Sequence, residues 1–127
     1  MRHLFLCLLV VLAISCNKNN ESPIILSTWP ITKVEGPATG SINQPVALTV
    51  YWPYSSGSCD VLDKFSELRQ GSFVTIKAFG HSAGGVCTAD AGIKTKIYHF
   101  VSASPGTFEL RFRSSDSSFI THTVTIN

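Results

Sequence analysis

The sequence predicts an all-β protein in which two antiparallel sheets pack as a sandwich. Apolar and polar residues alternate along several short stretches, as they do in strands with one buried face. Turns rich in Gly, Pro and Ser separate these stretches at intervals of roughly 8–15 residues. No long stretch carries the apolar spacing of an amphipathic helix. These observations predict about seven strands between residues 31 and 127.

The first two expected strands lie before residue 54. Ile31–Glu35 is a short strand that a Gly-Pro pair ends. Val46–Trp52 places two valines, a leucine and a tryptophan on one side and Ala, Thr and Tyr on the other, so one face should be buried. A proline on either side bounds this second strand.

The stretch Cys59–Gln70 admits two interpretations. Its apolar residues fall at helical spacing, and aspartates near its start could cap a helix. Alternatively, a strand near Phe65–Arg69 forms a hairpin with Phe73–Phe79 through a Gln-Gly-Ser turn. We prefer the hairpin, because a sandwich needs an extended strand at this point of the chain.

The remaining strands follow from the same alternation. They are expected at Ile93–Val101, Thr107–Arg113 and Phe119–Ile126, and a loop at Gly80–Gly92 precedes them. Lys94 and Lys96 are expected on an outer face, where charged side chains protect an edge strand from aggregation. His122 falls on the same side of its strand as the apolar residues, so we expect it in the core or at its edge.

Two motifs near the end of the chain resemble those of bacterial immunoglobulin-like domains. Pro105–Phe112 is similar to the segment that opens the penultimate strand in that family, and Thr121–Ile126 is similar to its threonine-rich closing strand. Val34–Pro37 and Val46–Val50 fit the first two strands. The resemblance implies an immunoglobulin-like sandwich over residues 31–127, and its motifs carry no catalytic residues.

The first sixteen residues have the layout of a secretory signal peptide. Leu4–Ile14 is an unbroken apolar run, shorter than the about 20 residues that a membrane-spanning helix needs. Ala13–Cys16 resembles the lipobox of bacterial lipoproteins, with Ala13 where Leu is usual. The resemblance implies cleavage after Ser15 and a diacylglyceryl group on the Cys16 thiol. An ordinary signal peptidase would cut at the same bond and leave Cys16 unmodified.

The lipobox resemblance implies attachment to a membrane of the bacterial cell envelope through Cys16. Asn17 stands where an aspartate would retain a lipoprotein at the inner membrane, so the outer membrane is expected. The domain organisation is then a removed signal peptide at 1–15, a lipidated cysteine with a flexible tether at 16–30, and a sandwich domain at 31–127.

The charge balance argues against a nucleic-acid partner. Lys and Arg total 10 against 8 Asp and Glu, and Arg2 leaves with the signal peptide. The mature chain is therefore nearly neutral and has no basic field that could neutralise phosphates.

Cys59 and Cys87 are expected to form a disulfide, because they are the cysteines that remain in an oxidising compartment. Closing a loop of about 29 residues would stabilise the fold by about 3.6 kcal/mol in the chain-entropy account. Both cysteines border loops and no Trp lies between them, so this is not the core disulfide of antibody domains. The rival is a metal site with His81, whose spacing matches no standard zinc motif.

The sequence does not predict an enzyme, a cofactor or a metal. Gly80–Gly84 contains a His-Ser pair but is no nucleophile elbow, and adjacent residues on an extended chain point apart. Asp60, Asp63 and Glu67 lack the alternating ligands and the glycine of a calcium loop.

Several side chains are candidates for binding. Tyr51 and Tyr54 lie on either side of Pro53 near a turn, and aromatic rings at a loop end can stack on sugars or proteins. The other candidates are His81 in the expected loop, and Arg111 and Arg113, which with the two strand lysines could form a basic stripe.

Two functional hypotheses follow. The first is an envelope-anchored module that binds an unknown protein or glycan, or is structural. The second is a small periplasmic inhibitor or accessory subunit of an enzyme, whose Gly80–Gly92 loop enters a cleft.

Overall fold

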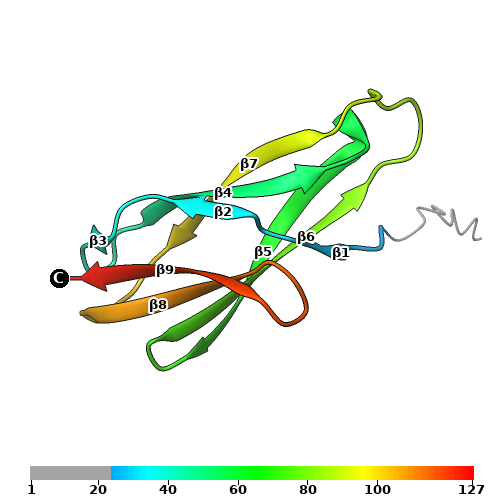
Figure 1. The fold of residues 1–127 in the computed structure, drawn as a ribbon. Helices are drawn as coiled ribbons and strands as arrows, with labels where there is room; N and C mark the ends of the chain where they lie inside the picture. Colours follow the sequence, from blue (N-terminus) through cyan, green and yellow to red (C-terminus); the bar gives the residue numbers. More distant parts are fainter. Residues whose placement is uncertain (1–23) are drawn as a thin grey trace, which may run out of the picture.

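Two packed β-sheets make up the part of the chain that the structure describes (Figure 1). The structure is a computed structural model, and it describes residues 24–127. The all-β sandwich that the sequence predicts is confirmed. The expected signal peptide, the expected lipid site Cys16 and the first part of the expected tether lie outside the described residues.

Nine strands occur in residues 24–127, where about seven were expected. The two additional strands, β1 and β3, are only three and two residues long. A 3-10 turn, η1, is the helical element of the described chain, and no helix there is long and apolar enough to cross a membrane. The elements are β1 (Ser27–Trp29), β2 (Lys33–Glu35), β3 (Thr39–Gly40), β4 (Val46–Tyr54), η1 (Gly57–Cys59), β5 (Asp60–Gln70), β6 (Phe73–Ser82), β7 (Gly92–Phe100), β8 (Gly106–Arg113) and β9 (Phe119–Ile126).

The larger sheet has the order β1-β6-β8-β9-β3, and β5 also pairs with β6. The smaller sheet has the order β2-β4-β7, so β7 and β5 are each an edge strand of their own sheet. Most pairs are antiparallel, but β6–β8 and β3–β9 are parallel. The expectation of wholly antiparallel sheets is therefore corrected at these two pairs.

The core lies between the two sheets and is built from the inward side of each long strand. In β4 every second residue from Val46 to Trp52 is buried, and in β8 Leu110 and Phe112 are fully buried, as the alternation predicts. The largest fully buried side chains are Phe100, Phe112, Ile31, Leu48, Ile76 and Leu110.

The stretch that admitted a helix or a strand is the strand β5, which forms a hairpin with β6. The register shifts between Leu62 and Lys64, so Asp63 is the extra residue of a β-bulge. Leu62 and Phe65 consequently lie opposite Gly80 and Ala78, on the same face of the sheet, although they are three residues apart. The helical spacing of the apolar residues in the sequence is therefore explained by the bulge at Asp63, which puts residues three apart on one face of the strand.

The sandwich begins earlier than the expected boundary at residue 31. Ser27–Trp29 pairs with β6, and the Trp29 ring packs edge-on against Trp52 at 5.0 Å between centroids. Ile31 is fully buried and its N–H donates to the Arg113 carbonyl at 3.1 Å. The range 16–30 is therefore not wholly a tether, because Ser27–Trp29 is a strand of the larger sheet.

Phe112→Ala should lower the free energy of unfolding by about 3–5 kcal/mol, because it leaves a cavity among fully buried side chains. Phe119→Ala is the matched control on the neighbouring strand, where the ring is 44% exposed, and should cost about 1 kcal/mol or less. Urea unfolding under oxidising conditions measures both, and equal losses would contradict this assignment of the core.

Candidate functional site

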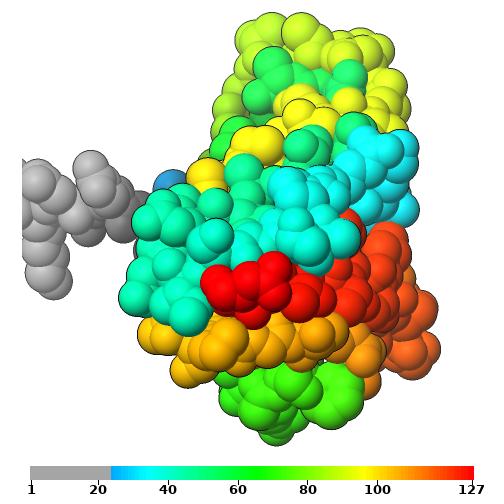
Figure 2. Space-filling model, turned by 90° about the vertical axis from the view of Figure 1, so that its left-hand side faces the viewer, coloured from blue at the N-terminus to red at the C-terminus, as the bar shows by residue number. Residues whose placement is uncertain are grey.

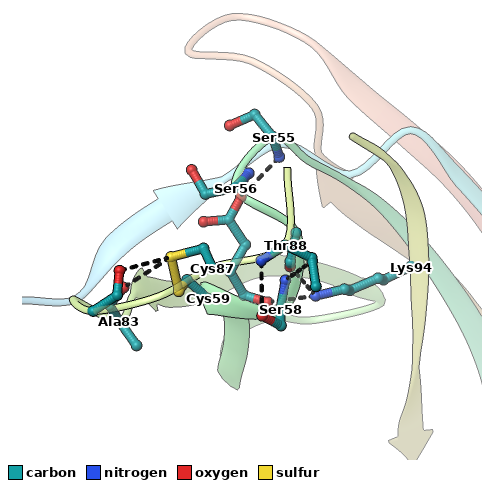
Figure 3. Close-up of a disulfide and its surroundings, with 11 residues drawn as sticks. Ser55, Ser56, Ser58, Cys59, Ala83, Cys87, Thr88 and Lys94 are labelled. Atoms are coloured by element: carbon teal, nitrogen blue, oxygen red, sulfur yellow. Dashed lines mark hydrogen bonds between the residues drawn. A yellow bond between two sulfur atoms is a disulfide. The ribbon is translucent and has the colours of Figure 1, made fainter. Parts of the chain in front are cut away.

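A set of polar contacts joins three segments at one end of the sandwich (Figure 3). These segments are the turn after β4, the start of β5 and the loop between β6 and β7. Cys59 and Cys87 form the expected disulfide, with their Cα atoms 5.3 Å apart. Both sulfur atoms are therefore engaged, and the alternative metal site that Cys59 and Cys87 would share with His81 is wrong.

The loop beside the disulfide is shorter than the expected Gly80–Gly92, because β6 continues to Ser82 and β7 starts at Gly92. Its base is held by backbone hydrogen bonds. The Ala83 N–H donates to the Cys59 carbonyl at 2.8 Å, and the Gly57 N–H donates to the Asp90 carbonyl at 3.0 Å. Val86 at the tip is fully exposed. The loop is thus fixed at its base and open at its tip.

Asp60 is a buried carboxylate, with 2% of its surface exposed. Burial by itself would raise the pKa of this carboxyl. The backbone N–H groups of Ser55 and Ser56 donate to Asp60 Oδ2, each at 2.8 Å. Together with the Ser82 hydroxyl and the Lys94 charge, they outweigh burial and hold the pKa of Asp60 below its ordinary value. The ionised Asp60 carboxylate thus holds the turn after β4 in place through these two hydrogen bonds.

Lys94 lies on the inner side of β7 and reaches across the sandwich. Its Nζ donates to the carbonyls of Gly57 at 2.7 Å and Asp60 at 2.8 Å. The same ammonium lies 4.6 Å from the Tyr54 ring centroid and 5.6 Å from the Trp52 ring centroid. The Tyr54 hydroxyl donates to Asp90 Oδ2 at 2.8 Å, so both the ring and the hydroxyl of this binding candidate are engaged.

Lys96 makes the equivalent contact two residues further along β7. Its Nζ donates to the carbonyls of Leu62 at 2.7 Å and Asp63 at 2.8 Å. Successive carbonyls of a regular strand point in opposite directions, and the bulge at Asp63 brings two of them to one ammonium. The outward orientation expected for Lys94 and Lys96 is therefore wrong. They share the inner face with the buried Tyr98 and Phe100.

Two further contacts continue this row between β7 and β5. The Tyr98 hydroxyl bonds to Glu67, and burial together with this carboxylate raises the pKa of Tyr98. The Arg69 guanidinium donates to the Val101 carbonyl at 2.8 Å and lies over the Phe100 ring. Side chains thus bridge the two edge strands along their length.

His81 forms a pair with Asp63, with His81 Nδ1 and Asp63 Oδ2 2.6 Å apart. A carboxylate that orients a histidine is one half of a hydrolase triad. In the part of the chain that the structure describes, no hydroxyl or thiol bonds to the other ring nitrogen, and no cluster of three metal-ligating side chains occurs. His122 lies at the core edge, as expected, with Nε2 3.0 Å from the Pro37 carbonyl oxygen.

The remaining binding candidates are dispersed. Arg111 Nε donates to Glu109 at 2.8 Å, and its guanidinium stacks on the Phe73 ring. Arg113 bonds to the Ser115 carbonyl and to Asp116 at the turn between β8 and β9. The Tyr51 hydroxyl donates to Glu35 at 2.6 Å on the other sheet. The prediction of a basic stripe is wrong, because Lys94 and Lys96 point inward. Arg111 and Arg113 each pair with an acidic side chain.

The inward lysines leave an apolar surface on the outer side of the smaller sheet. Ile93 is 55% exposed and Ile97 is 46% exposed, and they pair across the ladder with Pro53 and Thr49. We call this surface the open face, and it comprises Thr49, Tyr51, Pro53, Ile93, Thr95 and Ile97. Figure 2 shows the molecule from the end that carries the C-terminal strand. Sequence reasoning missed the open face, although the phase set by Tyr98 and Phe100 could have indicated it.

Comparisons with family models, with curated proteins and with solved structures find no match to this chain.

Lys96→Met should lower the free energy of unfolding by about 1–3 kcal/mol, because the carbonyls of Leu62 and Asp63 lose their donor while the aliphatic stem is kept. Lys77→Met on the exposed side of β6 is the control and should change stability by about 0.5 kcal/mol or less. If the two variants were equally stable in urea unfolding, the hydrogen bonds from Lys96 to Leu62 and Asp63 would contribute nothing to stability.

Asp60→Asn should flatten the acid dependence of stability. Because the folded pKa of Asp60 is lowered, its contribution is present above the unfolded pKa of about 3.9 and is lost as the pH falls through the folded pKa. The free energy of unfolding, measured from about pH 5 to about pH 2, should fall further for the wild type than for Asp60→Asn. Asp116→Asn removes a 95% exposed carboxylate as the control. Parallel curves for the wild type and Asp60→Asn would show that the ionised Asp60 carboxylate does not stabilise the fold.

Proposed function

We propose that this chain is a lipoprotein of the bacterial cell envelope whose immunoglobulin-like sandwich binds a protein partner. In this proposal a signal peptide directs export, Cys16 carries the acyl chains, and Asn17 permits transfer to the outer membrane. Two or more acyl chains give stable anchoring, since each buried CH₂ contributes about 0.8 kcal/mol.

The observation that supports binding is the open face on an edge strand. β7 pairs with β4 alone among the described strands, so its other side offers backbone groups for pairing with an added strand. Ile93 and Ile97 stand out from this strand on the same side, four residues apart. Alternate side chains beside a free edge are what an extended peptide needs for affinity and specificity.

A protein partner fits this surface better than a glycan does. Sugars are bound by exposed aromatic rings with free polar groups nearby. The Tyr54 ring lies under Lys94, and the Tyr51 hydroxyl is bound to Glu35. The exposed aliphatic side chains of Ile93 and Ile97 favour apolar peptide side chains instead.

The alternative is an inhibitor or accessory subunit whose loop 83–91 enters the cleft of an enzyme. One observation favours it, namely the exposed Val86 on a loop whose base is held by a disulfide. A fixed base lowers the entropy that such an insertion would cost.

Photo-crosslinking in cells separates these functions. Benzoylphenylalanine in place of Ile97 should give a discrete crosslinked protein, whereas the same residue in place of Leu68, which is 59% exposed on the larger sheet, should not. Ile97→Lys, with the crosslinker in place of Ile93, should abolish the product, because it puts a charge on the open face. A product from position 86 alone would favour the inhibitor.

Labelling with a palmitate analogue tests the anchor separately. The wild type should incorporate the label, and Cys16→Ala should not. Equal labelling of both, or no labelling of the wild type, would contradict the proposed lipid anchor at Cys16.

A further inference from the structure

The described chain starts at the end of the sandwich that carries the disulfide loop. Ile24 and Ile25 line a shallow groove together with residues of β6 and the loop, from His81 to Gly84. The C-terminal strand ends at the opposite side of the body (Figure 1). The two ends of the described chain therefore lie at opposite ends of the sandwich.

Three aliphatic side chains stand in water at this first end. Ile24 is 68% exposed, Ile25 is 85% exposed, and Val86 at the loop tip is fully exposed. Nothing lies within 4 Å of where a Cβ would stand at Gly84 or Gly85, so the tip projects from the body. Exposed aliphatic groups gathered on a projecting end are favourable only where they meet another apolar surface.

The acidic side chains at the same end do not project with the tip. Asp60 is buried against Ser55 and Ser56, and Asp90 accepts a hydrogen bond from Tyr54. Asp63 is paired with His81. The tip can therefore approach a negatively charged surface without bringing a free carboxylate ahead of it.

The length of chain before Ile24 limits how the body can stand above an anchor. Eight residue steps separate Cys16 from Ile24 and, whatever their conformation, span at most about 28 Å. The nine residue steps of β6, which runs from the far end to the loop, span about 30 Å. An anchored body could therefore rest its far end on the bilayer only with residues 16–24 fully extended, so the first end is the one held near the membrane.

We infer that the end defined by Ile24, Ile25 and Val86 lies against the lipid surface. This inference rests on the proposed acylation of Cys16. Apolar side chains at a bilayer surface enter the boundary between headgroups and acyl chains, where the apolar face of an interfacial helix lies about 5–10 Å deep. The far end, with the turn at Gly71 and Ser72, then faces away from the membrane, and the open face stands along the side of the body.

The test uses the full-length acylated protein in vesicles of phosphatidylethanolamine and phosphatidylglycerol whose acyl chains are brominated. Val86→Trp places a fluorophore at the tip, and Ser72→Trp places one at the far end as the matched control. Trp29 and Trp52 are present in both, and the wild-type emission is subtracted. We expect the emission added by Val86→Trp to fall at least about twofold in brominated vesicles and that added by Ser72→Trp to be unchanged.

Two results would overturn the inference in distinguishable ways. If mass spectrometry finds acyl chains on Cys16 but bromine does not quench the Val86→Trp signal, the anchor holds and the orientation is wrong. If Cys16 carries no acyl chain, the anchor and the orientation fail together. Quenching of both tryptophan positions to the same extent would show a body lying flat and would also contradict this orientation.

Discussion

The structure depends on a row of side chains that cross from β7 to β5, the edge strands of the two sheets. Lys94 and Lys96 each bring one ammonium to two backbone carbonyls, and Tyr98 and Arg69 continue the row. An inward ammonium is costly unless its protons are bonded, so these carbonyls are what permits lysines on an inner face. The row joins the two edge strands along most of their length.

The disulfide end is the continuation of this row. Lys94 donates to carbonyls of Gly57 and Asp60, and the Asp60 carboxylate accepts from the turn after β4. The disulfide joins the loop between β6 and β7 to the same end. The loop between β6 and β7 is thus fixed at its base against the turn after β4 and the start of β5. The outward position of Ile93 and Ile97 follows from the inward position of Lys94 and Lys96, because side chains alternate along β7.

Sequence patterns predicted the long strands well because apolar and polar residues alternate along them, as in Val46–Trp52 of β4 and Phe108–Arg113 of β8. They could not reveal the bulge at Asp63, which shifts the phase of β5 and imitates a helix. Because lysine is charged, hydrophobicity predicted that Lys94 and Lys96 lie on the outer face. It carries no information about the β5 carbonyls that accept hydrogen bonds from their ammonium groups. The disulfide followed from the cysteine count, whereas the three-residue β1 is too short to show any period.

The inward lysines can be observed directly by nitrogen-15 NMR of the lysine ammonium groups at neutral pH. Bonded ammonium protons exchange slowly with water and give cross-peaks, whereas those of solvated lysines exchange too fast. Cross-peaks are expected from Lys94 and Lys96, assigned by Lys→Arg substitution, and none from Lys64 or Lys77. Rapid exchange at all four positions would contradict the inward orientation of Lys94 and Lys96, since the row between β7 and β5 would then not exist in solution.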